Sequence, residues 1–321
     1  MGLMFDDAPD ADDVVERLND DDAEVRCVAV MDLREIDEDE AIPLAVKALS
    51  DIDAGVRVEA AQVMDEYTGA VVAEALVSAL SDSDEAVRKA AAETLAENKN
   101  DGAGPALIEG MKNEDAFIKA SCLRALRALR LPEAKAIALE CLEHADATVR
   151  REAVGVLAYL KSDDVLIALM NSARKDSDEN VRKVAMGSLV FSKTDKAIET
   201  LVDGLKDEHW QVREESAYVI GKVGQAAAVE SLIDAMNDEY WQVRVKAAAS
   251  LGKLKDPAAV DVLGQALSYN ISNLRKEAAA SLGEIKSVNA LPFLDIAKND
   301  VDPDVRKVVE WAIAEINSVK S

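Results

Sequence analysis

The sequence predicts an all-α fold in which ten copies of a two-helix unit stack into a single α-solenoid, or superhelix. A Val-Arg pair or a close variant recurs ten times at a step of 31 residues, with one step of 32. Apolar residues make up 49% of the chain and aromatic residues only 4%, a composition that suits thin, closely packed helices. A period of this length is typical of stacked arrays in which no single copy buries its own apolar face.

The recurring pair marks the second helix of each unit. It occurs at Val25-Arg26, Val56-Arg57, Val87-Arg88, Ile118-Lys119, Val149-Arg150, Val181-Arg182, Val212-Arg213, Val243-Arg244, Leu274-Arg275 and Val305-Arg306. One domain spanning residues 1–321 is expected, with units near 10–40, 41–71, 72–102, 103–133, 134–164, 165–196, 197–227, 228–258, 259–289 and 290–318. The single extra residue falls within 174–178.

The segment 84–111 illustrates the unit. Asp84 has the chemistry of a helix N-cap, because its carboxylate can accept the free amide hydrogens of the first turn. Val87, Ala91 and Leu95 then follow at four-residue steps, which places them on one buried stripe. After a polar break, a first-type helix of the next unit begins at Pro105. Helices of the same type are predicted at Val71–Leu80, Ala197–Leu205, Ala228–Met236 and Ala259–Leu267.

The cap residue aligns across most units, four positions before the basic residue of the pair. The aligned residues are Asp22 with Arg26, Asp53 with Arg57, Asp84 with Arg88, Asp115 with Lys119, Asp146 with Arg150, Asp178 with Arg182 and Asp302 with Arg306. We interpret them as a structural Asp/Arg ladder, in which each basic side chain meets the Asp of its own or an adjacent unit. Their regular spacing favours this structural role over a catalytic one.

The charge distribution bears on the partner. The net charge is −25, and residues 1–101 alone carry 28 acidic against 8 basic side chains. Binding of nucleic acid is not expected, because phosphate contacts need a surplus of Lys and Arg. The acidic third can steer a partner with a basic surface, act as an acidic mimic, or simply keep the array in solution. No apolar run is long enough to cross a bilayer, so no membrane contact is expected.

The start of the chain and its cysteines indicate where the protein is located and which residues are in its core. The acidic start of the chain does not resemble a secretion signal, and Cys27, Cys122 and Cys141 form no Cys-x-x-Cys motif. A cytoplasmic protein is therefore expected. Cys122 and Cys141 fall at apolar positions of their units and are predicted to be small core residues.

The motif Asp-x-x-Val-Arg followed by Ala-Ala and Leu-Gly, as in Val243–Gly252, resembles the short HEAT-like repeats first described in phycobilisome bilin lyases. The likeness covers roughly residues 10–318, and the ankyrin and tetratricopeptide signatures are absent. The resemblance implies a helical superhelix and a family of scaffolds, chaperones, bilin lyases and di-iron hydroxylases. The hydroxylases carry His-Glu pairs just after the Val-Arg position, where this chain has no His. Its two histidines are His144 and His209. Neither a metal site nor a cofactor is expected.

The repeat pattern breaks in the seventh to ninth units. The cap Asp is replaced by His209, Tyr240 and Ile271, and the triplet Trp-Gln-Val follows the first two, at Trp210–Val212 and Trp241–Val243. Stacking is expected to place Trp210 and Trp241 side by side along one edge. One interpretation is an aromatic strip that grips a partner. The other is that the rings fold over the helix ends and fill volume.

The leading hypothesis is a non-catalytic scaffold that binds another protein or a peptide on its concave face or edge. The candidate contact residues are Trp210, Gln211, Glu215, Tyr218, Tyr240, Trp241, Gln242 and Lys246. Glu152, Glu215 and Glu277 occupy equivalent positions and favour a solvated face over acid–base chemistry. The alternative is a bilin-lyase-like or tetrapyrrole-handling protein, in which Arg124, Arg127, Arg150 and Arg151 hold propionate groups.

Overall fold

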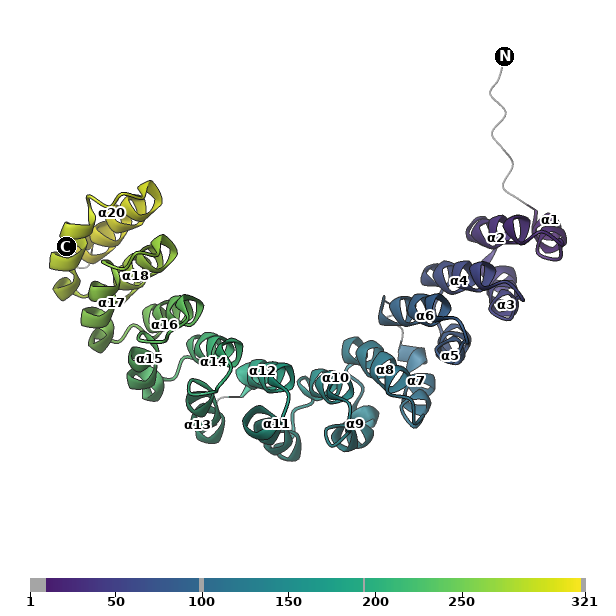
Figure 1. Cartoon of the computed structure of the whole chain (residues 1–321), viewed down its shortest axis with the longest axis horizontal. Coiled ribbons are helices and arrows are strands. Elements are labelled where there is room, and N and C mark those ends of the chain that lie inside the picture. Colours follow the sequence, from purple (N-terminus) through teal and green to yellow (C-terminus); the bar gives the residue numbers. More distant parts are fainter. Residues whose placement is uncertain (1–9, 98–100, 193, 319–321) are drawn as a thin grey trace, which may run out of the picture. The chain divides into compact units, whose positions relative to one another are not determined.

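The computed structural model describes residues 10–97, 101–192 and 194–318. Within these ranges the chain forms twenty α-helices and eight short 3-10 helices, and no β-strand (Figure 1). The helices follow one another as pairs, which confirms the predicted all-α solenoid of two-helix repeats. None of the helices in these ranges combines the length and apolar character that crossing a bilayer requires.

The helices divide into two compact units, residues 1–160 and 161–321. The first contains α1 Ala11–Arg17, α2 Ala23–Met31, α3 Glu38–Ala48, α4 Ala54–Val63, α5 Ala70–Ala79, α6 Glu85–Glu97, α7 Gly104–Gly110, α8 Ala116–Leu129, α9 Lys135–Cys141 and α10 Ala147–Leu157. The second contains α11 Asp163–Lys175, α12 Glu179–Ser188, α13 Asp195–Gly204, α14 Trp210–Val223, α15 Val229–Ala235, α16 Trp241–Leu254, α17 Val260–Ala266, α18 Ser272–Ile285, α19 Leu291–Ala297 and α20 Pro303–Ser318.

The even-numbered helices begin where the recurring pair predicts. Each starts two residues before the apolar member of its pair, as α14 does before Val212 and α16 before Val243. In most repeats the carboxylate of the cap Asp accepts amide hydrogens of the first turn. Asp53, for example, accepts from Gly55 at 2.7 Å and Val56 at 3.3 Å. The same role belongs to Asp22, Asp84, Asp115, Asp146, Asp178 and Asp302.

Most odd-numbered helices of the later repeats begin with a 3-10 turn. The predicted helix Ala228–Met236 is α15, Val229–Ala235, preceded by the 3-10 helix Ala226–Ala228. The remaining 3-10 helices are Asp32–Glu35, Met64–Glu66, Asp101–Ala103, Pro132–Ala134, Leu189–Phe191, Pro257–Ala259 and Val288–Ala290. Where a 3-10 turn directly precedes an odd-numbered helix, it shortens the first helix of the pair without changing the repeat step. The 3-10 helices Asp32–Glu35, Met64–Glu66 and Leu189–Phe191 instead extend the even-numbered helices α2, α4 and α12.

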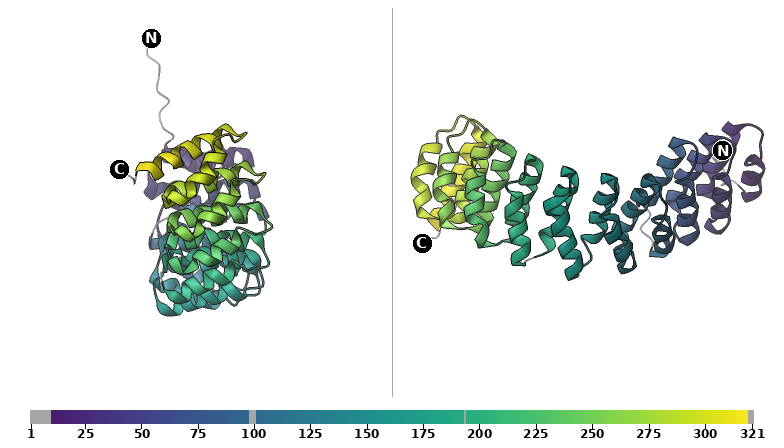
Figure 2. Two further views of the ribbon diagram at one scale, coloured as in Figure 1. Left: turned by 90° about the vertical axis from the view of Figure 1, so that its left-hand side faces the viewer. Right: turned by 60° about the horizontal axis from the view of Figure 1, so that its bottom comes forward.

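Within each of the two compact units, successive even-numbered helices pack directly against one another, and the odd-numbered helices cover their other side (labelled in Figure 1; Figure 2 gives two further views). The packing is close enough to exclude side chains. A Cβ added to Gly252 of α16 would lie 2.8 Å from the Ser281 Cα of α18. The Ser281 hydroxyl in turn donates to the Ala248 carbonyl at 2.8 Å. Small residues thus set the spacing of these helices, and the repeat hydroxyl fixes their register.

The core is a continuous apolar layer in each unit. Val212, Ile220, Val243 and Leu251 are fully or almost fully buried between the helix layers.

The structure tests the prediction that two of the three cysteines lie in the core. Cys122 and Cys141 are buried, which confirms their assignment to the core, and burial raises the pKa of the Cys122 thiol to about 12. Such a thiol stays protonated and unreactive at neutral pH. Cys27 is partly exposed.

Candidate functional site

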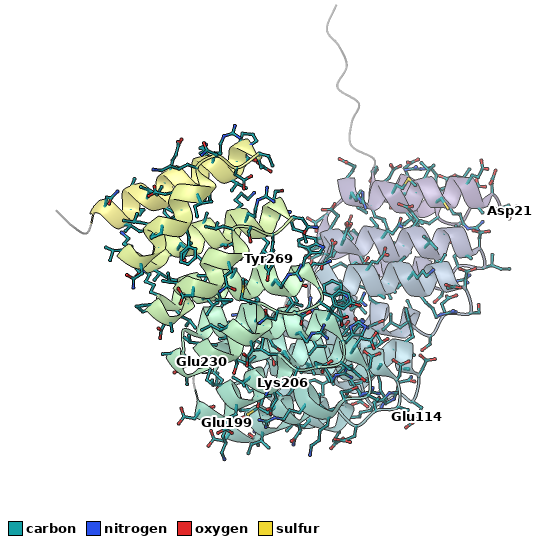
Figure 3. The ribbon with its side chains drawn as sticks, turned by 60° about the vertical axis from the view of Figure 1, so that its left-hand side comes forward. Asp21, Glu114, Glu199, Lys206, Glu230 and Tyr269 are labelled. Carbon is teal, nitrogen blue, oxygen red and sulfur yellow. The ribbon has the colours of Figure 1, made fainter. Side chains whose placement is uncertain are left out.

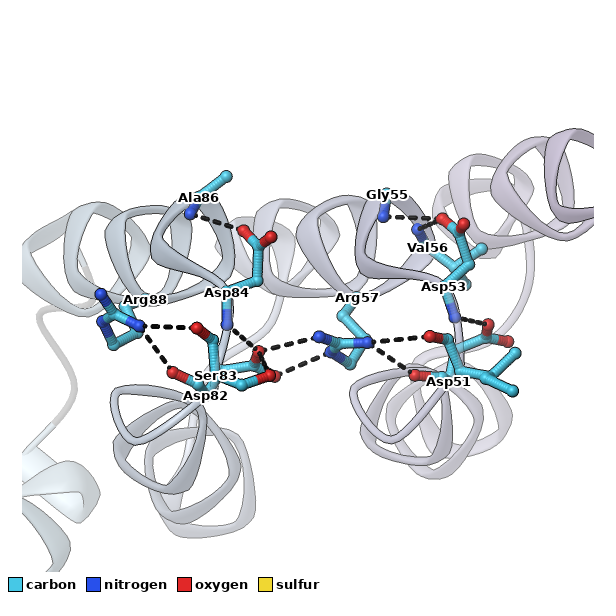
Figure 4. Close-up of polar contacts among 11 residues, drawn as sticks. Asp51, Asp53, Gly55, Val56, Arg57, Asp82, Ser83, Asp84, Ala86 and Arg88 are labelled. Carbon is cyan, nitrogen blue, oxygen red and sulfur yellow. Dashed lines mark hydrogen bonds and ion pairs between the residues drawn. The ribbon is translucent and has the colours of Figure 1, made fainter.

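In several repeats the arginine is held at two places. Arg57 Nη1 donates to the carbonyls of Asp51 and Ile52 in its own turn, at 2.9 and 3.3 Å. Its Nε and Nη2 donate to the Asp82 carboxylate of the next repeat, at 2.7 and 2.8 Å (Figure 4). We call the contact between a repeat arginine and the side chain 25 residues later a rung. Each complete rung joins one helix–helix turn to the next.

The predicted Asp/Arg ladder therefore exists, but with different aspartates. The rungs include Arg26–Asp51, Arg57–Asp82, Arg182–Asp207, Arg213–Asp238 and Arg275–Asp300. The prediction that the cap aspartates meet the arginines is wrong, because amide hydrogens of the first helical turn occupy their carboxylates. The aspartate two residues earlier remains available, and its Oδ1 also accepts the cap residue's own amide hydrogen, as Asp82 does from Asp84. An Asp-x-Asp spacing in the sequence is the signal that identifies it.

The remaining repeat arginines contact their own turns. Nη1 of Arg88, Arg150 and Arg306 donates to backbone carbonyls five or six residues earlier. At the side chain 25 residues after Arg88 the chain carries Asn113, and after Lys119 it carries His144. These positions offer no carboxylate to complete a rung.

The eighth repeat differs in another way. The side chain 25 residues after Arg244 is Tyr269, which lies in the turn before α18 (Figure 3). The Arg244 guanidinium lies over this ring, 5.4 Å from its centroid. Its Nη1 donates to the Asp238 carbonyl at 2.8 Å, while its buried Nε has no hydrogen-bond partner. A cation–π contact thus takes the place of the ion pair.

An aromatic surface lies at the amino-terminal ends of α14, α16 and α18. The rings of Trp210 and Tyr240 stack with centroids 5.4 Å apart and planes 12° apart, and the Arg213 guanidinium lies 5.6 Å from the Tyr240 centroid. The sequence predicts Trp241 as the neighbour of Trp210, but the stacked ring is that of Tyr240. The replaced cap residue, one position earlier, faces the preceding repeat. We call Trp210, Tyr240, Trp241 and Tyr269 the aromatic edge.

Much of the aromatic edge remains open to solvent. Tyr240, Trp241 and Tyr269 are 38–40% exposed, so these rings do not simply fill volume at the helix ends. None of α14, α16 and α18 has a side-chain cap hydrogen bond. Next to the rings, His209 Nδ1 and Gln242 Oε1 are buried without a hydrogen-bond partner. Gln211 is half-buried in the first turn of α14.

Further along the same helices, three ammonium groups surround one ring. The Nζ atoms of Lys222, Lys246 and Lys253 lie 5.4, 5.6 and 5.7 Å from the Tyr218 centroid. We call these four residues the Tyr218 cluster. The structure thus brings the predicted residues Tyr218 and Lys246 together and adds Lys222 and Lys253, which the sequence argument missed. The i,i+4 spacing of Tyr218 and Lys222 was the available signal.

Glu215 lies beside this cluster and is half-buried against α12. A Cβ added to Gly187 would lie 3.0 Å from its Oε1 atom. Burial raises the pKa of Glu215, and the nearby Lys183 and Lys246 act in the opposite direction. Burial also raises the pKa of the equivalent Glu277 on α18. In both carboxylates burial therefore disfavours the charged form.

The arginines of the tetrapyrrole hypothesis have partners within the protein. Glu152 is 6% exposed, and its carboxylate lies 3.0 Å from Arg151 and 3.7 Å from Arg124. The aliphatic part of Arg127 packs against Gly155, where a Cβ would lie 2.9 Å from Arg127 Cδ. The single carboxylate of Glu152 thus offsets at most one of these four positive charges. In the described ranges, no group of three or more His, Cys, Asp or Glu side chains is arranged to hold a metal ion.

Known structures with this architecture include helical-repeat proteins. The chain superposes on Kap95p from a complex with RanGDP with a TM-score of 0.67 and 15% identity, covering 95% of this chain and 49% of Kap95p. Importin beta gives a TM-score of 0.63 and 13% identity, with 95% and 50% covered. An engineered protein gives 0.51 and 21%, with 96% and 98% covered. The chain therefore spans about half the length of Kap95p and of importin beta.

Comparison with protein-family models identifies the repeats from the sequence. No curated protein sequence matches the chain. The family model for HEAT repeats matches residues 11–84, 73–158, 135–221, 167–240 and 229–314, which together cover almost all of it. The narrower phycobilisome-lyase type of repeat stays a prediction. The helix pairs, the rungs and these matches together establish that the chain belongs to the HEAT-repeat family.

Proposed function

We propose that the chain is a non-catalytic scaffold that binds a partner protein through the aromatic edge and the adjacent face of α14, α16 and α18. The observation that carries the proposal is the exposed set of rings Tyr240, Trp241 and Tyr269 at adjacent repeats. Large, rigid aromatic side chains give much contact area at a small cost in conformational entropy, and Trp and Tyr are enriched among residues that dominate binding energy.

The polar groups next to the rings support the proposal. His209 Nδ1, Gln242 Oε1 and Arg244 Nε are buried without hydrogen-bond partners, and all three lie in the turns and first helical turns that carry the aromatic edge. Buried polar atoms of this kind are rare in native proteins, because each loses its contacts with water. A bound polypeptide offers backbone amides and carbonyls that can satisfy such groups after a small side-chain rearrangement.

The fold suits the same role. Kap95p in the matching structures is complexed with RanGDP or with Nup1, so a row of helix pairs can hold another polypeptide. At 15–16% identity this likeness concerns the fold, and the partner of the present chain is a separate question. A cytoplasmic location and the absence of nucleic-acid binding remain predictions, as does the tetrapyrrole alternative.

The test compares tryptophans in different places. A partner captured on the immobilised full chain is purified, and its affinity is measured by calorimetry for the wild type and for the double variant Trp210→Ala/Trp241→Ala. We expect at least roughly a thirtyfold loss of affinity, the size expected when binding hot spots are removed. Trp311→Ala is the matched control, because Trp311 is 44% exposed on α20, away from the aromatic edge. Unchanged affinity of the double variant, with helicity retained, would refute the proposal.

A further inference from the structure

The helix α16, like α8, is basic in a chain whose net charge is negative. The whole protein carries a net charge of −25, yet the segment 241–255 contains Arg244, Lys246, Lys253 and Lys255 and not one Asp or Glu. α16 lies between α14 and α18 and packs against both. A local basic surface therefore interrupts an acidic protein at the helix that also carries Trp241.

The Tyr218 cluster concentrates this charge. Lys246 and Lys253 are seven residues apart on α16, so they lie on one side of the helix, and Lys222 approaches from α14. Three like charges close to one ring repel one another. The electron-rich face of Tyr218 offsets that repulsion only in part, since an exposed cation–π contact is weak. An added negative charge would be stabilised at this place.

No carboxylate of the described residues supplies that charge through an ion pair. Lys286 at the end of α18 contacts Glu315 at 2.6 Å, and Lys298 contacts Asp295 at 2.7 Å. The three lysines of the Tyr218 cluster have no such contact, and Lys222 and Lys253 are exposed. The neighbouring Glu215 is half-buried against Gly187 of α12, and Glu277 of α18 is also half-buried. Both carboxylates interact with Lys246 at longer range, and Glu277 also with Lys253, without forming an ion pair with the cluster.

Arg244 lies nine residues before Lys253, about half a turn away around α16, so it faces the turn of its own repeat and stands apart from the Tyr218 cluster. Its rung has Tyr269 where Arg213 has Asp238 and Arg275 has Asp300. The distance along α16 from Lys246 to Lys253, which share one side of the helix, is about 10 Å at the helical rise per residue, a length that about three residues of an extended peptide span.

We propose that this face binds an acidic segment of the partner protein, with carboxylates at the Tyr218 cluster. The inference rests on the proposed function and specifies the chemistry of the partner. It contrasts with the basic partner that the charge of residues 1–101 suggests, because it concerns a different part of the surface. A second copy of the chain is a poorer occupant, since two molecules of net charge −25 repel each other.

The probe is a short fluorescein-labelled peptide of alternating Glu and Ala, and the comparison peptides carry Gln or Lys in place of Glu. Fluorescence anisotropy at low salt measures binding to the full chain. We expect the Glu peptide to bind and the other two to bind at least roughly tenfold more weakly. The Lys246→Glu/Lys253→Glu variant should lose roughly tenfold or more in affinity for the Glu peptide.

The matched control is Lys196→Glu/Lys206→Glu. It changes the net charge equally, but it alters exposed lysines of α13 and the turn that follows it. It should bind the Glu peptide nearly as well as the wild type. Circular dichroism verifies that both variants keep their helices, and the Tyr218→Phe variant, which keeps the ring, should also retain binding.

Four results would overturn the inference. The first is equal affinity of the full chain for the Glu, Gln and Lys peptides, and the second is an equal loss of affinity for the Glu peptide in the two double variants. The third is full displacement of the Glu peptide by inorganic phosphate at constant ionic strength. The fourth is self-association of the wild-type chain that Lys246→Glu/Lys253→Glu abolishes. The two proposals fail separately. If the captured partner tolerates the lysine variant but not Trp210→Ala/Trp241→Ala, only the acidic segment is wrong. If it tolerates the tryptophan variant, the proposed function is wrong.

Discussion

Arg213 and Asp238 are 25 residues apart and form a two-pronged ion pair, with Nε–Oδ2 and Nη2–Oδ1 distances of 2.6 and 3.0 Å. Arg213 also donates to the carbonyls of Asp207 and Glu208 in its own turn. One side chain therefore ties together two consecutive turns. The pair is mostly buried, with about a tenth of each side chain exposed.

Removal of the carboxylate from this rung should weaken the array. In Asp238→Asn the Arg213 charge stays buried without its counter-charge, which costs about 3 kcal/mol in comparable buried pairs. Urea unfolding followed by circular dichroism measures the change. Asp234→Asn, at an exposed position of α15, serves as the control and should leave the midpoint unchanged. Equal midpoints for the two variants would mean that the rung adds nothing to stability.

Addition of a carboxylate should complete the interrupted rung. Tyr269→Asp places an acceptor where Arg244 has only a ring, and we expect a gain of about 1 kcal/mol, the value of one added hydrogen-bonded pair. Tyr269→Asn separates the charge from the loss of the ring and should not stabilise the protein. The same Asp variant should also bind the partner less well, because it removes a member of the aromatic edge. A thermal midpoint for the Asp variant no higher than for the Asn variant would contradict this account.

Backbone conformation offers an independent test. α14 ends at Gly224 with φ of 77°, whereas the equivalent residue after α16 is Lys255, with φ of 55°. A left-handed conformation strains any residue with a Cβ, so Lys255→Gly should stabilise the protein by about 1 kcal/mol. Lys255→Ala retains the Cβ and should change little. Differential scanning calorimetry measures the thermal midpoints of the two variants and the wild type. A midpoint of the Gly variant below that of the wild type would contradict strain at this turn.

The rungs also predict how stability depends on pH. The hydrogen bond from Arg57 lowers the pKa of Asp82, and those from Arg26 and Arg275 lower the pKa values of Asp51 and Asp300. Because these pKa values are lower in the folded state, the unfolded chain takes up protons first. The stabilisation is thus present above the unfolded-state pKa of about 3.9 and is lost as the pH falls below it. In an acid titration, Asp82→Asn should show a shallower loss of stability than the wild type.

Glu215 should behave in the opposite sense. Its raised pKa means that the folded state binds the proton more tightly, so ionisation at neutral pH weakens the fold and acidification relieves the penalty. Glu215→Gln is therefore expected to raise the thermal midpoint at pH 7, with the gain vanishing below the unfolded-state pKa of about 4.3. The adjacent Glu214→Gln provides the comparison. A gain that persists unchanged at pH 3 would exclude this electrostatic origin.

The sequence predicted the helices well, but it did not predict which side chains from neighbouring repeats contact one another. The recurring Val-Arg step located the start of every even-numbered helix, because the period of the repeat and the cap chemistry are local properties. It misassigned the acidic partners of the arginines, because the cap aspartate and the aspartate two residues earlier carry the same side chain. Only the first-turn amides of each helix distinguish them. Likewise it selected Tyr218 and Lys246 but missed Lys222 and Lys253 of the same cluster.

The amino-acid sequence by itself determined the helix pairs, their number, their caps and their buried stripes, since each depends on residues within one 31-residue unit. Only the tertiary structure decided that Tyr240 stacks on Trp210, that Tyr269 occupies the place of a carboxylate beside Arg244, and that three lysines meet at Tyr218. Those contacts join residues from neighbouring repeats. Their geometry depends on how closely α14, α16 and α18 approach, which the small residues between these helices fix.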